Sequence, residues 1–340
     1  MMKFDATLPP YATFTQRDRD RFLYHRQGET RIGEKIVLLP EWDSLADFPK
    51  VKFVILGIPE GIGPLANRGR AGARQGWFAF LRKFLNMQDN RFLRGDTIAI
   101  AGTVTTIDLP DQVNAKDYQP DAFDDIQAMV SQLDGRVAKA VQDLQLPDGV
   151  TLIVIGGGHN NAYPIMKGLG PGATVVNLDP HADYRAKEGR HSGNPFRYAM
   201  EEGLMARYYP VGLHKAYNNE EAIEAMEGEA RVEPLWWDYI SDPEQIFYWV
   251  TERLKGHGGK YIGLEMDMDG LAQMPSSAYS PEGFTPREAR RWMRCWAQTF
   301  PNTKYLHLPE AAPENPREVD FAGKMLAYLV HDFMSNQLTS

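Results

Sequence analysis

Residues 173–183 read ATVVNLDPHAD, an apolar run followed at once by a polar cluster. The run Ala173–Leu178 has the length and apolar content of a buried strand in a parallel sheet. In the cluster, Asp179, His181 and Asp183 occupy alternate positions, so an extended chain projects all three side chains to one side. This stretch therefore predicts a strand that ends at a site where carboxylates and an imidazole converge.

Three further polar clusters stand where other predicted strands end. They are Gly156-Gly157-Gly158-His159, Glu265-Met266-Asp267-Met268-Asp269 and Pro309-Glu310-Ala311-Ala312-Pro313. Open α/β sheets bind their ligands at the edge where the carboxyl ends of the strands meet. Two histidines and four aspartates at one such edge could not stay ionised together without bound cations. The clusters together predict a two-metal site.

Each of these polar residues also has a plainer interpretation. An isolated aspartate after a strand usually caps a helix or binds backbone amides, and glycines before a helix can cradle a phosphate. The run Gly156-Gly157-Gly158 lacks the ending of a P-loop and the spacing of a dinucleotide fingerprint. Because Asp-x-His-x-Asp, Asp-x-Asp and a glycine-rich histidine occur together, we favour metal binding, with the glycines bringing the backbone close to the metals.

The chain after residue 51 alternates short apolar runs with longer amphipathic segments, as parallel strands joined by helices do. One helix shows an apolar stripe from Ile126 to Leu144. We expect an α/β fold with three layers (αβα) and a mostly parallel sheet of about eight strands. It forms a single domain over residues 46–340, preceded by an N-terminal arm over residues 1–45. The expected strands are Val51–Gly57, Thr97–Ala101, Thr151–Ile155, Ala173–Leu178, Arg207–Leu213, Arg231–Trp236, Lys260–Glu265 and Thr303–Leu308.

Composition narrows the classes of function. The 340 residues are 43% hydrophobic and 24% charged, as in an ordinary globular protein. A net charge of -8 argues against a general nucleic-acid surface. Met1–Arg31 contains no apolar segment of the kind found in a secretory signal or membrane span. Cys295 is the single cysteine, which fits a reducing compartment. We expect a cytoplasmic protein that acts on a small molecule and contacts neither nucleic acid nor membrane.

The predicted ligands indicate both the metal and its chemistry. Oxygen-rich sets suit Mg²⁺ or Mn²⁺, and imidazole adds affinity for later transition metals, so four aspartates with two histidines favour Mn²⁺ over structural Zn²⁺. Two ions about 3.5–4 Å apart share bridging carboxylates and lower the pKa of a bridging water, which can attack an electrophilic carbon. The ligand set thus predicts hydrolysis without a protein nucleophile.

From residue 51 onward, the order of these motifs resembles the ureohydrolase superfamily of arginases, agmatinases and formimidoylglutamases. The resemblance implies an arginase-like fold, a homo-oligomer and two Mn²⁺ ions per chain. Glu310 corresponds to a carboxylate that lies near the substrate in the family, where it can accept hydrogen bonds from an amidine or guanidine. The resemblance also implies that one ion is held by His159, Asp179, Asp183 and Asp267, and the other by His181, Asp179, Asp267 and Asp269, with Asp179 and Asp267 bridging.

The residues after the second cluster favour one branch of this superfamily. Arginases and agmatinases usually carry His-Gly-x-Pro there, and the histidine shuttles protons. This chain has Ser192-Gly193-Asn194-Pro195-Phe196, which resembles formimidoylglutamase, as do Gly-Gly-Gly-His and Asn67-Arg68-Gly69-Arg70-Ala71-Gly72-Ala73. His191, one position earlier, is a candidate proton shuttle if the loop register shifts.

The resemblance implies the formimidoylglutamase reaction of histidine degradation. Mn-bound hydroxide attacks the formimino carbon of N-formimino-L-glutamate, and formamide and L-glutamate are released. Asp183 orients the hydroxide and moves a proton to the leaving nitrogen. The two carboxylates of this substrate require polar and basic groups in the pocket. The candidates in or near the loops are Ser192, Asn194, Arg70, Arg74, Arg185, Arg190 and Arg197.

Two departures from the family leave the substrate open. Glu265 stands where a serine or threonine commonly precedes the Asp-x-Asp pair. Met274-Pro275-Ser276-Ser277-Ala278-Tyr279 lacks the usual Asp-Pro start of the next loop. A guanidine ureohydrolase that releases urea is therefore a second hypothesis. A non-catalytic metabolite-binding relative is a third, and the intact ligand set counts against it.

Overall fold

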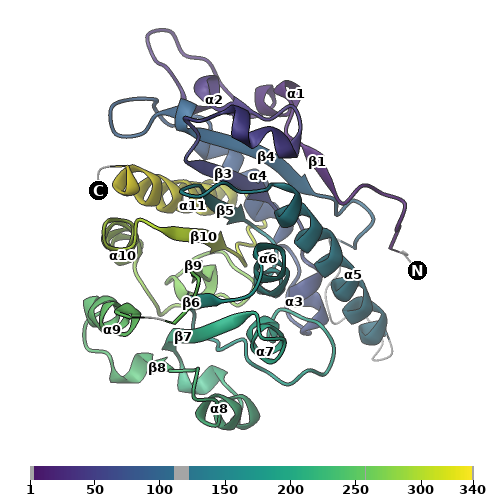
Figure 1. Cartoon of the computed structure of the whole chain (residues 1–340), viewed down its shortest axis with the longest axis vertical. Coiled ribbons are helices and arrows are strands. Elements are labelled where there is room, and N and C mark those ends of the chain that lie inside the picture. Colours follow the sequence, from purple (N-terminus) through teal and green to yellow (C-terminus); the bar gives the residue numbers. More distant parts are fainter. Residues whose placement is uncertain (1–3, 111–121, 257, 339–340) are drawn as a thin grey trace.

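The computed structural model describes residues 4–110, 122–256 and 258–338, so the first three residues of the predicted arm lie outside the described residues. Helices cover both faces of one sheet, which makes three layers (Figure 1). The strands are β1 (Tyr11–Thr13), β2 (Val37–Leu38), β3 (Phe53–Gly57), β4 (Ile98–Val104), β5 (Thr151–Ile155), β6 (Ala173–Leu178), β7 (Met205–Leu213), β8 (Leu235–Trp236), β9 (Tyr261–Met266) and β10 (Thr303–Leu308). The α-helices are α1 (Gln16–Asp20), α2 (Ile32–Lys35), α3 (Ile62–Ala66), α4 (Arg74–Phe84), α5 (Ala122–Asp143), α6 (Ala162–Leu169), α7 (Pro195–Glu201), α8 (Glu220–Glu227), α9 (Glu244–Leu254), α10 (Pro286–Thr299) and α11 (Pro316–Gln337).

The described strands form one mostly parallel sheet. Its order is β1-β4-β3-β5-β10-β9-β6-β7-β8, and β2 also pairs with β4. β1 runs antiparallel to β4, while the pairings among β3 to β10 are parallel. The predicted α/β class with a mostly parallel sheet is confirmed. The strands that precede the four polar clusters, β5, β10, β9 and β6, are neighbours at the centre of this sheet.

Both faces of the sheet are buried, because alternate residues of each strand enter different cores. In β3, Phe53 and Ile55 pack in one cluster with α4, α9, α10 and α11. Val54 and Leu56 of the same strand pack in the other cluster, with α3, α5, α6 and α7. A strand that is covered on both faces needs apolar side chains on both, so its sequence is nearly continuously apolar and does not alternate between apolar and polar residues. The polar clusters therefore stand out at the point where these runs stop.

Within the described residues the sheet has ten strands, two more than the sequence predicts. The additional strands, β1 and β2, come from the N-terminal arm and pair with β4. Conversely, the predicted strand Arg231–Trp236 narrows to Leu235–Trp236, with a single bridge between Val232 and Tyr208. Pro234 has no N–H to donate to a ladder, which explains why the longer strand does not form.

Within the described ranges, no helix is long and apolar enough to cross a membrane. The boundary at residue 45, the homo-oligomer and the cytoplasmic location stay predictions.

Candidate metal centre

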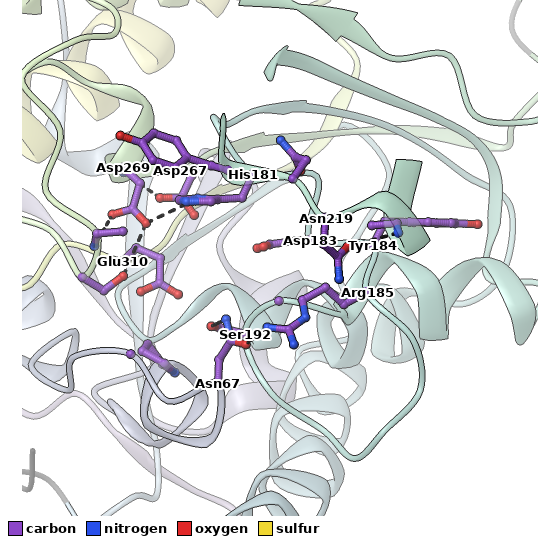
Figure 2. Close-up of a pocket in the computed structure, with 18 residues that line it drawn as sticks. Asn67, His181, Asp183, Tyr184, Arg185, Ser192, Asn219, Asp267, Asp269 and Glu310 are labelled. Atoms are coloured by element: carbon purple, nitrogen blue, oxygen red, sulfur yellow. Dashed lines mark hydrogen bonds and ion pairs between the residues drawn. The ribbon is translucent and has the colours of Figure 1, made fainter. Parts of the chain in front are cut away.

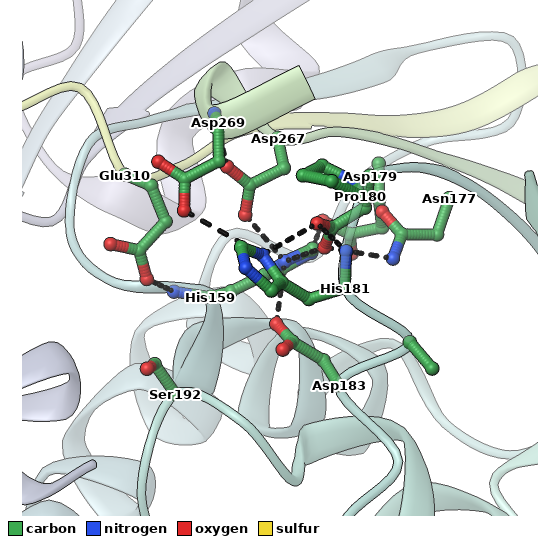
Figure 3. A network of polar contacts seen from close by, with 12 residues as sticks. His159, Asn177, Asp179, Pro180, His181, Asp183, Ser192, Asp267, Asp269 and Glu310 are labelled. Atoms are coloured by element: carbon green, nitrogen blue, oxygen red, sulfur yellow. Dashed lines mark hydrogen bonds and ion pairs between the residues drawn. The ribbon is translucent and has the colours of Figure 1, made fainter. Parts of the chain in front are cut away.

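The four polar clusters meet at one edge of the sheet, each following its own strand (Figure 3). His159 follows β5, Asp179 and His181 follow β6, Asp267 and Asp269 follow β9, and Glu310 follows β10. Because these strands are neighbours and parallel, their carboxyl ends bring residues from distant parts of the chain into contact. The six predicted metal ligands are thus brought together.

His159 lies at the centre of one group of carboxylates. Its Nδ1 is 3.1 Å from Asp179 Oδ2, 3.0 Å from Asp183 Oδ2 and 2.8 Å from Asp267 Oδ2. The ligand atoms of these four residues all lie within 4.8 Å of one another. Yet both ring nitrogens of His159 are buried without a hydrogen-bond partner among the described residues. Atoms that converge on one point without hydrogen-bond geometry fit a divalent cation at that point.

A second group adjoins the first through Asp179. His181 Nδ1 lies 3.3 Å from Asp179 Oδ1 and 3.8 Å from Asp269 Oδ2. Asp179 therefore faces both histidines, one with each carboxylate oxygen, as a bridging ligand would. This arrangement fits two cation positions that share a carboxylate.

Backbone N–H groups donate hydrogen bonds to three of the aspartates and orient their side chains. An aspartate that binds a backbone amide with one oxygen can still bind a metal with the other, so the two interpretations are compatible. Asp179 Oδ1 accepts a hydrogen bond from His181 N at 2.7 Å, and Asp267 Oδ1 accepts one from Asp269 N at 2.7 Å. Asp269 Oδ1 accepts one from Ala278 N at 3.0 Å. In each residue, Oδ2 remains directed at the histidines. Such outer contacts fix a ligand before the metal arrives.

Two residues of the site hold their side chains through an unusual backbone. Asp183 has φ 47° and Glu310 has φ 66°, a left-handed conformation that non-glycine residues adopt rarely. Glu310 Oε1 accepts a hydrogen bond from His159 N at 2.7 Å, while its Oε2 is buried and has no hydrogen-bond partner among the described residues. Strained conformations of this kind persist where the surroundings over-determine them, which is common at functional sites.

The electrostatics of the cluster also favour a cation. Burial and the charge of Asp179 raise the pKa of Asp183 to about 6. Burial and the charges of Asp179 and Asp269 hold the pKa of Asp267 well above its usual range. Burial lowers the pKa of His181, but contact with the Asp179 carboxylate outweighs it and raises the pKa to about 10. Two imidazoles are thus too little positive charge for four carboxylates, and divalent cations would supply the rest.

A cavity of about 360 Å³ opens beside the cluster (Figure 2), a volume in the usual range for small-molecule sites. One wall is the cluster itself, with His181, Asp183, Asp267, Asp269 and Glu310. The remaining lining residues are Pro64, Asn67, Gly69, Tyr184, Arg185, Ser192, Gly193, Tyr217, Asn218, Asn219, Ala222, Ser277 and Ala278.

Arg185 is the only arginine or lysine among the described residues that line this cavity. Its Nη1 donates to Asn67 Oδ1 at 2.8 Å, and Asn67 Nδ2 in turn contacts Ser192 Oγ at 3.4 Å. The Arg185 side chain is 44% exposed and its Nη2 contacts Glu188 at 3.0 Å. The predicted candidates Ser192 and Arg185 therefore do reach the site, both from the loop between β6 and α7.

Other predicted substrate contacts do not line the cavity. Arg190 is buried beneath it, where Nε pairs with Asp134 at 2.8 Å and Nη1 donates to Asn194 Oδ1 at 2.8 Å. Arg70 is directed outward, with Nη2 donating to the carbonyl of Ser276 at 2.6 Å. These contacts tie loops together. Arg74 begins α4 and Arg197 lies in α7, and neither borders the cavity.

His191, the candidate proton shuttle, is also outside the cavity lining. It is 1% exposed, its Nδ1 accepts a hydrogen bond from Gly193 N at 3.1 Å, and its Nε2 lies 3.0 Å from Asn194 Nδ2. Burial, together with the charges of Arg185 and Arg190, lowers its pKa to about 3. The imidazole is therefore neutral and hydrogen-bonded to residues of its own loop. The loop does not adopt the shifted register that would bring His191 to the cavity for a role as proton shuttle.

Several residues at the site were not predicted. Tyr217, Asn219 and Ser277 line the cavity from loops whose sequences carry no distinctive motif. His307 of β10 contacts Glu265 of β9 directly behind His159. The one available signal was the departure at Glu265, a charged residue in an otherwise uncharged strand.

Comparison with known proteins gives one consistent result. The model of the arginase family matches residues 51–335. A formimidoylglutamase from Macrococcus caseolyticus is 26% identical over 290 residues, which cover 82% of this chain and 84% of the relative. Among solved structures, formimidoylglutamase from Bacillus subtilis has a TM-score of 0.69 at 18% identity, over 95% of this chain and 99% of the other. Trypanosoma cruzi formiminoglutamase, solved with Mn²⁺, has a TM-score of 0.65 at 22% identity, over 90% and 99%. These structural similarities show a shared fold.

Proposed function

The chain belongs to the arginase family and is a hydrolase of C–N bonds in amidines or guanidines, and we propose that it releases formamide from N-formimino-L-glutamate. The observation that carries this substrate is the make-up of the cavity, where Arg185 and Ser192 stand across from the carboxylate cluster (Figure 2). Such a cavity suits a molecule with an amidine at one end and carboxylates at the other. The names of the relatives support the same substrate.

Two Mn²⁺ ions per chain complete the proposed site. His159, Asp179, Asp183 and Asp267 would hold one ion, and His181, Asp179, Asp267 and Asp269 the other. The unpartnered nitrogens of His159 and the crowding of four carboxylates support this assignment. When bound, such a pair lowers the pKa of a shared water and polarises the bond to be cleaved.

Asp183 and Glu310 would act on the substrate directly. Asp183 lines the cavity with its carboxylate beside the predicted metal position, so it can accept a proton from the attacking water and pass it to the leaving nitrogen. Glu310 Oε2 is buried without a hydrogen-bond partner among the described residues and borders the same cavity. It can accept an N–H of the amidine and hold the electrophilic carbon toward the water.

Arg185 would bind a substrate carboxylate. Its guanidinium is held by Asn67, which leaves further N–H donors available to a ligand. A hydrogen bond between two charged groups is stronger than a neutral one and fixes the orientation of the ligand. Ser192, next to Asn67, offers a hydroxyl to the same end of the substrate.

A guanidine is the second candidate substrate, and one contact favours it. Glu188 pairs with Arg185 at 3.0 Å and offsets part of its positive charge. A site with this pair attracts a dianionic substrate less strongly than an unpaired arginine would. Cleavage of a guanidine would release urea in place of formamide.

A substrate panel distinguishes the two reactions. Mn-loaded protein is incubated with N-formimino-L-glutamate, arginine, agmatine and guanidinobutyrate, and formamide, urea and ammonia are measured. We expect formamide and glutamate in equal amounts from the first substrate alone. Urea from any guanidine at a higher kcat/KM would replace the proposal with the guanidine reaction, and no product from the panel would refute both.

A further inference from the structure

A buried glutamate and a buried histidine lie directly behind His159, on the side away from the predicted metal. Glu265 and His307 pair in register on the neighbouring parallel strands β9 and β10, so their side chains project from the same face of the sheet. All three residues are 0% exposed. Neither Glu265 nor His307 lines the cavity, so neither is available to a substrate.

One carboxylate oxygen lies between the two imidazoles. Glu265 Oε2 is 2.7 Å from His307 Nδ1 and 3.4 Å from His159 Nε2. The opposite nitrogen of His159, Nδ1, faces the carboxylates of Asp179, Asp183 and Asp267. The separation of 3.4 Å is a few tenths of an ångström longer than a normal hydrogen bond.

Core packing alone does not account for this pair. Burying a carboxylate is costly unless it is paired and hydrogen-bonded, and an apolar residue would fill the same space at lower cost. The residues next to Glu265 also leave space for bulky side chains around it. Gly263 makes room for the ring of Tyr305, since a Cβ there would lie 2.1 Å from that ring, and Tyr305 in turn borders Glu265.

A third metal site does not account for it either. His159, Glu265 and His307 offer three ligand atoms close together. All three residues are fully buried, however, and neither Glu265 nor His307 lines the cavity, so an ion would have no entry path from it.

We propose that Glu265, itself held by His307, is a positioning residue that accepts the Nε2–H of His159 and so directs the Nδ1 lone pair toward the metal. An ionised carboxylate has no hydrogen to donate, so the proton must sit on Nε2, which fixes the tautomer that binding through Nδ1 requires. This inference rests on the proposed Mn²⁺ site.

Titration of metal-free protein with Mn²⁺ tests the proposal, with wild type, Glu265→Gln, His307→Gln and a matched control. The control is Asp332→Asn, which makes the same carboxylate-to-amide change at a buried residue paired with Arg290 at 2.7 Å, away from the site. Binding is followed by calorimetry and by the electron paramagnetic resonance of Mn²⁺, and folding by the melting temperature of the metal-free protein.

We expect Glu265→Gln to weaken one of the two Mn²⁺ positions by about 10- to 100-fold and to leave the other within about twofold of wild type. The signal of an exchange-coupled pair should then give way to that of an isolated ion at limiting Mn²⁺. His307→Gln should weaken the same position by about 3- to 10-fold, because Glu265 is retained but less firmly held. Asp332→Asn should leave both positions unchanged.

The proposal would be overturned if each Mn²⁺ position had the same affinity in Glu265→Gln as in wild type. So would an equal loss at both positions with a matching drop in melting temperature, since that is the result of a general structural defect. If Glu265→Gln does not fold, the same two criteria apply to His307→Gln. Failure of wild type to bind Mn²⁺ would instead refute the proposed function, so the two failures are distinguishable.

Discussion

Replacing Asp183 with asparagine should stabilise the metal-free protein at neutral pH and reduce its stabilisation by Mn²⁺. Burial and the charge of Asp179 raise the pKa of Asp183 from 3.8 to about 6. At about 1.4 kcal/mol for each pKa unit, this corresponds to about 3 kcal/mol of lost stability once the carboxyl is ionised. Asparagine carries no charge and avoids this loss.

The sign follows from which state holds the proton more tightly. The folded protein protonates Asp183 at a higher pH than the unfolded chain does, so this contribution is fully present below pH 3.8 and is lost as the pH rises through about 6. The gain of the variant is therefore about 3 kcal/mol near pH 7.5 and disappears below about pH 4.

Urea unfolding in EDTA and in excess Mn²⁺ measures both effects. Wild type should gain about 4 kcal/mol when free Mn²⁺ is about 1,000 times its Kd, and Asp183→Asn should gain much less. The two proteins thus change order between the two conditions. A variant that is less stable than wild type in EDTA at neutral pH, or one that gains as much from Mn²⁺, would refute the electrostatic account of the cluster.

Three further changes give separate tests. Arg185→Gln should raise KM for N-formimino-L-glutamate about 10- to 100-fold, because a charge-assisted hydrogen bond is lost. The KM for an amidine that lacks carboxylates should change little. Steady-state kinetics that show an equal rise in KM for both substrates would contradict the role of Arg185. His191→Asn should reduce the slope of the free energy of unfolding against pH by up to about 1.4 kcal/mol per pH unit between pH 6.5 and about 3. The reason is that His191 is protonated at a higher pH in the unfolded chain than in the folded protein, so wild type loses stability as the pH falls. An unchanged slope in urea titrations would contradict a neutral, buried imidazole. Gly57→Ala places a Cβ 2.5 Å from the Trp77 ring and should lower the free energy of unfolding by about 1–3 kcal/mol. Gly135→Ala on α5, where no atom lies within 4 Å of the new Cβ, should raise it by about 0.5–1 kcal/mol. Equal melting temperatures for the two variants would contradict the packing around Gly57.

The central strands could be predicted because burial on both faces leaves a clear trace in sequence. Ala173–Leu178 is a strand with the predicted bounds, since a continuous apolar run between polar residues has few other interpretations. β1 and β2 could not be predicted. Tyr11–Thr13 and Val37–Leu38 are short and only partly buried, and their pairing with β4 depends on where the rest of the sheet lies.

The convergence of the metal-binding side chains could be predicted for a similar reason. Once Asp179 and Asp267 are assigned to the ends of parallel strands, the topology brings them to one edge. The contact between Glu265 and His307 depends on the register of β9 against β10, which no local pattern specifies. Likewise, Arg185 and Arg190 lie on the same loop, but only the path of that loop decides that Arg185 reaches the cavity and Arg190 is buried beneath it.

Anomalous diffraction at the manganese edge, from crystals of Mn-loaded protein, tests the central claim most directly. We predict two peaks about 3.5–4 Å apart at the carboxyl ends of β5, β6 and β9. One should lie at Nδ1 of His159 and the other at Nδ1 of His181, with Asp179 and Asp267 between them. A single peak, two peaks that share no carboxylate, or manganese bound elsewhere would contradict a binuclear hydrolytic site.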